Sequence, residues 1–113
     1  MRAPPIPKIM LPHKINYWIY NGSDDFGNPA YGNPVTIERV RFDETTVFSR
    51  DGTQNKIVAN GVIFIDAVNS TPFLNFEEQS LVIFNSRELV VQKVIPCYQP
   101  FSADIHHYEL EVL

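Results

Sequence analysis

The sequence has one cysteine, Cys97, among its 113 residues, so no disulfide can form within the chain. Prolines interrupt the N-terminal stretch MRAPPIPKIMLPHK, where a secretory signal needs an unbroken apolar run. No stretch reaches the about 18 consecutive apolar residues typical of a membrane span. We therefore expect a protein that is made in a reducing compartment and does not contact a membrane.

Positive charge is also scarce. Nine Lys and Arg residues stand against 13 Asp and Glu residues, which gives a net charge of −4. Proteins that hold a nucleic-acid backbone over a broad face do so with clustered Lys and Arg that displace counterions. The charge balance therefore argues against such a face, although local basic spots remain possible.

Recognisable catalytic motifs are missing. The sequence has no glycine-rich phosphate loop, no G-x-S-x-G elbow and no H-E-x-x-H. The stretch DGTQNKIVANGV, which begins at Asp51, fails as a calcium loop because Lys56 replaces the required Gly and Val62 the required Glu. We expect no enzyme activity, no metal and no cofactor.

Cys97, His106 and His107 are the residues that most invite a chemical interpretation. Adjacent residues on a strand project to opposite faces, so the two histidines cannot bind one ion without a bulge. A nucleophilic Cys97 paired with a histidine, with Asp104 orienting the pair, is the alternative, but no helix N-terminus or oxyanion hole is evident near Cys97. We expect an inert, largely buried thiol, and His107 as a solvated residue on a polar strand face.

The sequence is rich in short β-branched and aromatic runs separated by turn residues, which predicts an all-β fold. The runs are HKINYWIY, VTIERVRF, NKIVANGVIFIDA, SLVIF, ELVVQKVIPC and HHYELEVL. We predict a small closed or nearly closed β-barrel of about six mostly antiparallel strands, with long loops, over residues 13–113. Residues 1–12 contain four prolines and should form an extended arm.

Alternation within these runs predicts which side chains face the core. In the second run the apolar phase flips by one residue between Ile37 and Val40, which predicts a β-bulge near Glu38 or Arg39. The runs LVIF and VVQKVI are apolar on both faces, as in strands of a closed barrel or strands that also face a neighbouring subunit. In the last run the predicted inward set is Tyr108, Leu110 and Val112, and the outward set is His107, Glu109 and Glu111.

Three long connections separate these runs, at residues 21–34, 43–55 and 69–79. Connections of this length in a small domain are usually functional or disordered. The pair Asp51 and Gly52 should form a turn tip, because Asp-Gly supplies the positive φ of tight turns.

The stretches VRFDETTVFSRDGTQNKIVANGVIFIDAVNSTP and VIPCYQPFSADIHHYELEVL, with the Pro-rich PPIPK, carry a family resemblance. The chain resembles the minor capsid protein family of tailed phages and prophages of Gram-positive bacteria. The resemblance implies a virion structural protein at the head-to-tail connection, similar to the completion or stopper proteins beneath the portal and adaptor rings. Such a protein is made in the cytoplasm of the bacterial host and assembles with itself as a ring, a hexamer or a dodecamer. It contacts portal, adaptor and tail proteins, and packaged double-stranded DNA passes through the ring without sequence-specific binding.

This resemblance suggests two sets of functional residues. The loop from Asp43 to Asn55 is the candidate channel gate, with acidic side chains that would repel the DNA backbone. Its residues are Asp43, Glu44, Ser49, Arg50, Asp51, Gly52, Thr53, Gln54 and Asn55. The candidate subunit or partner interface consists of Pro4, Pro5, Ile6, Pro7, Asp24, Asp25 and Phe26.

The alternative function is an oligonucleotide-binding-like barrel that binds single-stranded nucleic acid. Arg39 and Arg41 share a strand face, and several aromatic residues lie between Tyr17 and Tyr31. Exposed aromatic side chains stack bases in such barrels, and basic side chains follow the phosphates. This alternative predicts a salt-sensitive affinity for single strands.

Overall fold

The computed structural model describes residues 3–48 and 57–113. Within these residues the chain forms eight β-strands and one short 3-10 helix. The elements are η1 (Lys8–Met10), β1 (His13–Trp18), β2 (Tyr20–Ser23), β3 (Pro29–Tyr31), β4 (Val35–Phe48), β5 (Ile57–Asp66), β6 (Leu81–Phe84), β7 (Arg87–Tyr98) and β8 (Ile105–Val112).

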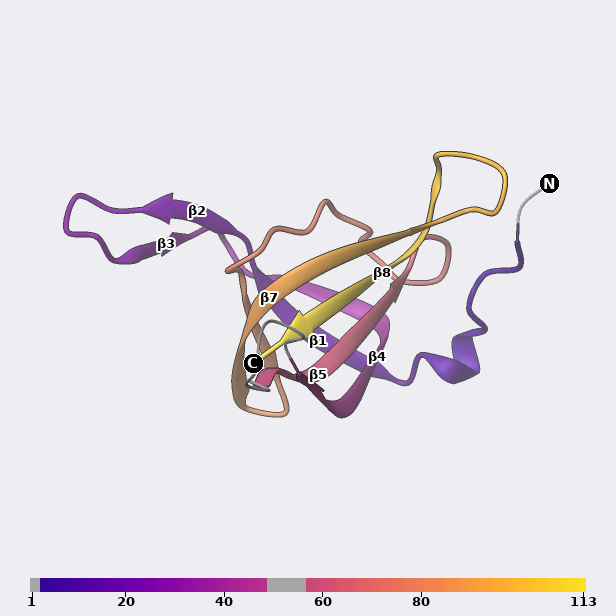
Figure 1. The fold of residues 1–113 in the computed structure, drawn as a ribbon, viewed down its shortest axis with the longest axis horizontal. Helices are drawn as coiled ribbons and strands as arrows, with labels where there is room; N and C mark the ends of the chain where they lie inside the picture. The colour runs from indigo at the N-terminus through magenta and orange to yellow at the C-terminus, as the bar shows by residue number, and fades with distance from the viewer. Residues whose placement is uncertain (1–2, 49–56) are drawn as a thin grey trace.

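Six of the strands close into an antiparallel barrel in the order β1-β4-β5-β8-β7-β6 (Figure 1). The barrel closes where β6 pairs with β1, with Asn16 opposite Ile83 and Tyr17 opposite Val82. The predicted all-β barrel of six strands is therefore confirmed. The strands correspond to the six β-branched and aromatic runs of the sequence, because only such runs place an apolar side chain on the inner face at every second position.

The predicted bulge is confirmed and lies at Arg39. His13 pairs with Val40 and Lys14 with Glu38, so Arg39 has no partner on β1. Its φ of 61° lies in the left-handed region. The extra residue shifts the alternation of inward and outward side chains by one position. Ile37 and Val40, on either side of the bulge, are both fully buried.

The core fills the barrel with inward-facing side chains from all six strands, together with Phe76 from the connection between β5 and β6. The predicted inward face of the last strand is confirmed: Leu110 and Val112 are fully buried, and Tyr108 packs against the core. Phe76 packs edge-on against Tyr17 and Tyr108, with ring centroids 5.2 Å apart in both pairs. The connection between β5 and β6 thus contributes to the core.

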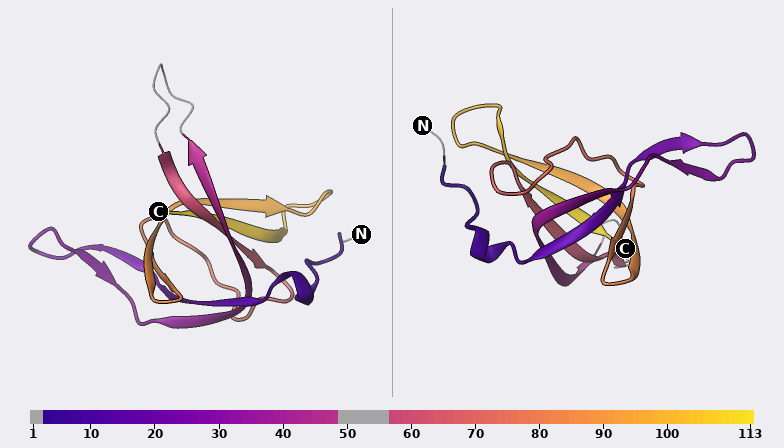
Figure 2. Two further views of the ribbon diagram at one scale, coloured as in Figure 1. Left: turned by 90° about the horizontal axis from the view of Figure 1, so that it is seen from below. Right: turned by 180° about the vertical axis from the view of Figure 1, so that it is seen from behind.

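Two of the three predicted long loops contain strands. Residues 21–34 hold most of a two-stranded hairpin, β2 and β3, which projects from the barrel (Figure 1). In the connection predicted over residues 43–55, strand β4 continues to Phe48, because residues 45–48 are two threonines, a valine and a phenylalanine with high β-propensity. Figure 2 shows the β4–β5 hairpin extending beyond the barrel in a direction different from the β2–β3 hairpin.

The Pro-rich arm lies against its own barrel. The backbone N–H of Ala3 donates to Gln99 Oε1 at 2.8 Å, and that of Ile6 donates to Asp66 Oδ1 at 3.0 Å. The side chain of Asn69 donates to the carbonyl of Ile6 at 2.6 Å. The arm is extended up to Pro7 but then forms η1, a correction to the prediction of an extended segment throughout. Among the residues described, no helix has the length and apolarity to cross a membrane.

Candidate functional site

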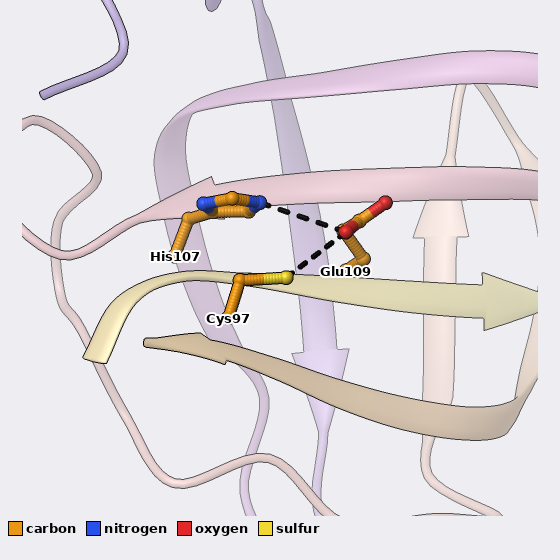
Figure 3. A group of neighbouring side chains, drawn as sticks. All are labelled: Cys97, His107 and Glu109. Atoms are coloured by element: carbon orange, nitrogen blue, oxygen red, sulfur yellow. Dashed lines mark hydrogen bonds and ion pairs between the residues drawn. The ribbon is translucent and has the colours of Figure 1, made fainter. Parts of the chain in front are cut away.

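Cys97, His107 and Glu109 form a cluster on the outer face of the barrel, on the paired strands β7 and β8. Cys97 lies directly opposite His107 in the antiparallel register. Glu109 is two positions after His107 and therefore projects from the same face of β8. Figure 3 shows the three side chains pointing toward one another. The fold thus brings together a thiol, an imidazole and a carboxylate.

The reactive atoms of the cluster are close. The Cys97 thiol donates a hydrogen bond to Glu109 Oε2, with 3.0 Å between sulfur and oxygen. His107 Nε2 lies 3.6 Å from the same carboxylate oxygen. All three potential ligand atoms lie within 4.8 Å of one another, and all three side chains are partly buried. Cys97 is therefore less buried than predicted, and His107 is less solvated than predicted.

His106 continues this cluster toward the N-terminal arm. The pairing register shifts between Cys97 and Tyr98, which pair with His107 and Ile105, so His106 is the extra residue of a bulge. The bulge brings the two imidazoles together, with 2.8 Å between His106 Nδ1 and His107 Nδ1. The prediction that the two histidines project to opposite faces is therefore wrong at this point, because the backbone departs from regular strand geometry.

The thiol is poorly suited to nucleophilic attack. Burial, and then the hydrogen bond and negative charge of Glu109, raise the pKa of Cys97 from 9.0 to about 11. The nucleophile in cysteine chemistry is the thiolate, which nearby positive charge or a helix N-terminus normally stabilises. Here a carboxylate faces the sulfur instead. The arrangement favours binding of a cation over covalent catalysis.

Only the first part of the predicted channel gate lies within the described residues. Asp43 Oδ1 accepts from Arg41 Nε at 2.8 Å, and Glu44 Oε1 from an Arg87 guanidinium nitrogen at 2.5 Å. Asp43 is half-buried and Glu44 is exposed, and both are paired with arginines, which weakens the repulsion toward DNA that we expect of them. The remaining predicted gate residues, Ser49, Arg50, Asp51, Gly52, Thr53, Gln54 and Asn55, lie outside the described residues.

Asp24, Asp25 and Phe26 form the turn that ends the β2–β3 hairpin. Asp24 Oδ1 accepts the backbone N–H groups of Phe26 and Asn28, both at 2.9 Å, so this carboxylate stabilises the turn. The side chain of Phe26 is 89% exposed. The turn therefore presents an aromatic ring at the tip of a projecting hairpin, and its role as an interface stays a prediction.

The predicted interface residues of the arm, Pro4, Pro5, Ile6 and Pro7, hydrogen bond to the barrel through Pro4 and Ile6. The three prolines are exposed. Their contact with a neighbouring subunit stays a prediction.

Sequence reasoning missed the barrel residues that hold the arm, above all Asp66. This carboxylate is fully buried and accepts three backbone N–H groups, from Ile6, Val68 and Asn69. The signal available in the sequence was an Asp at the end of an apolar run, followed by Ser70 four residues later. Ser70 Oγ completes the network by donating to the carbonyl of Arg39 and accepting from the backbone N–H of Asp66.

Comparison with known proteins identifies the family. Searches among curated proteins and among solved structures each gave no match. The model of the minor capsid protein family matches residues 7–112, which includes the whole barrel and part of the arm. The chain therefore belongs to the minor capsid protein family, a family of structural proteins of the phage virion.

Proposed function

We propose that the protein is a head-to-tail connector of the completion or stopper type, which assembles as a ring beneath the portal and adaptor. In this position the ring retains packaged DNA and offers a docking surface for the tail. The family assignment supports a role in the virion. The arrangement of the barrel's projections supports the more specific role in a ring.

The observation that carries this proposal is that three segments around one small barrel, the arm and two projecting hairpins, each present an exposed apolar side chain. The arm presents Ile9, the β2–β3 hairpin Phe26, and the β4–β5 hairpin Phe48, with 88%, 89% and 52% of their surfaces exposed. The three segments lie on different sides of the barrel (Figures 1 and 2). Large apolar side chains that are exposed in this way are typical of surfaces that partners cover.

A ring gives two of these segments, the arm and the β2–β3 hairpin, a neighbouring subunit to contact. The arm and the β2–β3 hairpin lie on opposite sides of the barrel, so each can contact a different neighbour in a closed ring (Figure 1). The β4–β5 hairpin is then free to point toward the channel axis. The pairing of Asp43 with Arg41 and of Glu44 with Arg87 leaves the base of this hairpin close to neutral, which suits a surface that DNA slides past without binding.

The alternative, a barrel that binds single-stranded nucleic acid, has less support. Oligonucleotide-binding barrels have five strands, whereas this barrel has six. Arg41, one of the two arginines on which this alternative rests, is paired with Asp43. A filter-binding titration with single-stranded DNA tests this alternative, because it predicts an affinity that falls steeply as salt rises.

The test of the connector proposal is cryo-electron microscopy of virions from the phage or induced prophage that encodes this chain. A ring of six-stranded barrels between the portal complex and the tail is expected, with the β4–β5 hairpin nearest the axis. Density for the barrel elsewhere in the capsid would refute the junction role and leave the family assignment intact. A ring with the β4–β5 hairpin on its outer surface would refute the channel-facing orientation.

A further inference from the structure

We propose that Cys97, His107 and Glu109 form a binding site for one zinc ion, with a water molecule in the fourth coordination position. This inference is independent of the proposed role in the virion. It rests on the chemistry of the three donors, on their spacing, and on the hydrogen bonds that orient the imidazole.

The donor set fits zinc. Zinc is a borderline-soft ion that is bound in proteins by thiolate, imidazole and carboxylate groups, usually with tetrahedral geometry. Ligand atoms around a tetrahedral zinc ion lie about 3.3 to 3.8 Å apart, given metal-to-ligand distances of about 2.0 to 2.3 Å. The separations from Glu109 Oε2 are 3.0 Å to Cys97 Sγ and 3.6 Å to His107 Nε2. All three ligand atoms lie within 4.8 Å of one another, so zinc binding requires side-chain rotations that bring them to tetrahedral spacing.

A chain of hydrogen bonds fixes the tautomer of His107. The carbonyl oxygen of Pro4 can only accept, so His106 Nε2, at 2.7 Å from it, carries the proton. In a neutral His106 ring, Nδ1 is then an acceptor, and His107 Nδ1, at 2.8 Å, must donate to it. The remaining nitrogen, His107 Nε2, therefore has a free lone pair. A histidine that donates from one ring nitrogen and presents the other is the typical arrangement of a metal ligand.

In the neutral form of His107, this lone pair faces another acceptor. Glu109 Oε2 is an anionic oxygen, and it lies 3.6 Å from His107 Nε2. Among the ion pairs of the described residues, Glu109 has no Lys or Arg partner. Two electron-rich atoms at this distance attract a cation, either a proton on the imidazole or a metal ion. A zinc ion supplies that charge and binds both atoms.

Cys97 completes the site when it loses its proton. On binding, the S–H bond breaks, the sulfur's electron pair coordinates the metal, and the proton passes to solvent. Glu109, which accepts from the thiol in the metal-free protein, becomes free to coordinate with the same oxygen. No oxidation or reduction takes place.

The binding test uses the full chain without a polyhistidine tag, treated with a chelator and returned to metal-free buffer. The metal-free protein is titrated with zinc chloride in a calorimeter, and the heats are expected to show one zinc site per chain. Cobalt(II) is the spectroscopic probe: a thiolate-to-cobalt charge-transfer band is expected, and equimolar zinc should abolish it. The absence of stoichiometric zinc binding, or a cobalt spectrum without the thiolate band, would overturn the proposal.

Variants locate the site. Cys97→Ala and His107→Asn each remove one ligand and are expected to weaken zinc binding at least 100-fold. The matched control is Glu111→Gln, which changes a carboxylate on the same face of β8 that is not part of the cluster. His106→Asn keeps all three ligands but removes the orienting imidazole, and is expected to weaken binding 10- to 100-fold. An unchanged zinc affinity in Cys97→Ala would refute the site. If a variant fails to fold, the cobalt band of the unaltered chain decides whether the thiolate binds the metal.

Discussion

Asp66, at the end of strand β5, accepts a hydrogen bond at 3.0 Å from the backbone N–H of Ile6, a residue of the N-terminal arm 60 positions earlier. The other oxygen of the same carboxylate accepts the backbone N–H groups of Val68 and Asn69 at 2.9 and 2.8 Å. Because Asp66 is fully buried, no water replaces these partners. One carboxylate thus fixes both the turn after β5 and the path of the arm.

Replacing Asp66 with Ala should lower the free energy of unfolding by about 2 to 4 kcal/mol, because three backbone donors in partly buried hydrogen bonds lose their acceptor. Urea denaturation followed by tryptophan fluorescence measures this change. Asp66→Asn should also destabilise, since its NH2 group faces backbone donors. The control is Asp104→Asn at an exposed position, which should stay within about 0.5 kcal/mol of the unaltered protein. A similarly small effect of Asp66→Ala would contradict the structural role assigned to this carboxylate.

Gly61 in β5 leaves space for the ring of Phe42, because it has no side chain. A Cβ atom at position 61 would lie 2.7 Å from Phe42 Cζ and 2.9 Å from Cε2. The ring cannot easily move away, because it is stacked on Phe84 with centroids 4.9 Å apart and Arg87 lies over its face. Gly61→Ala should therefore destabilise the barrel by about 1 to 3 kcal/mol through overpacking.

A double-mutant cycle tests this clash directly. Phe42→Leu removes the two ring atoms that a new Cβ would meet, so Gly61→Ala should cost less in that background than in the unaltered chain. The free energies of unfolding of the four proteins give the coupling. Strictly additive effects would show that the cost of Gly61→Ala has another origin, such as a contact with the carbonyl of Asp43 at 3.3 Å.

The barrel was predictable from the sequence because its signals are local. Alternating apolar residues identified the six barrel strands, and the change of phase between Ile37 and Val40 located the bulge at Arg39 to within one residue. The β2–β3 hairpin escaped prediction because its strands are only four and three residues long and are rich in Gly, Asn and Pro. Tyr20 and Tyr31 mark it, with ring centroids 6.2 Å apart, but two tyrosines are a weak signal.

The cluster on β7 and β8 was not predictable for a different reason. Cys97 and Glu109 are 12 positions apart and meet only because the antiparallel register sets Cys97 opposite His107. The pairing register depends on the whole barrel and cannot be deduced from the sequence of either strand alone. The bulge at His106 likewise follows from the pairing of Tyr98 with Ile105. The sequence supplied the residue types, and the fold supplied their arrangement.

Phe26 gives a test of the proposed ring that leaves the barrel alone. Because its side chain is 89% exposed, Phe26→Ser should leave the melting temperature within about 2 °C of the unaltered protein. If the β2–β3 hairpin contacts a neighbouring subunit or the adaptor, the same change should lower the yield of tailed, DNA-filled particles at least tenfold. Complementation of a phage that lacks the gene, scored by electron microscopy and plaque count, measures this. The control is Phe101→Ser, equally exposed in the connection between β7 and β8.

The reactivity of Cys97 separates a structural thiol from a catalytic one. Its pKa of about 11, raised from 9.0 by burial and by Glu109, leaves about 100-fold less thiolate near neutral pH than an ordinary cysteine has. Alkylation by iodoacetamide in the presence of a chelator should therefore be about 100-fold slower than that of a free thiol at pH 7.5. The rate should rise tenfold per pH unit until about pH 11, whereas a free thiol levels off near pH 9. Glu109→Gln removes the negative charge and should speed the reaction at pH 7.5, while Glu111→Gln should not. A rate in the unaltered protein equal to or above that of a free thiol near neutral pH would contradict the assignment of Cys97 as a non-catalytic thiol. It would support a nucleophilic role for Cys97 instead.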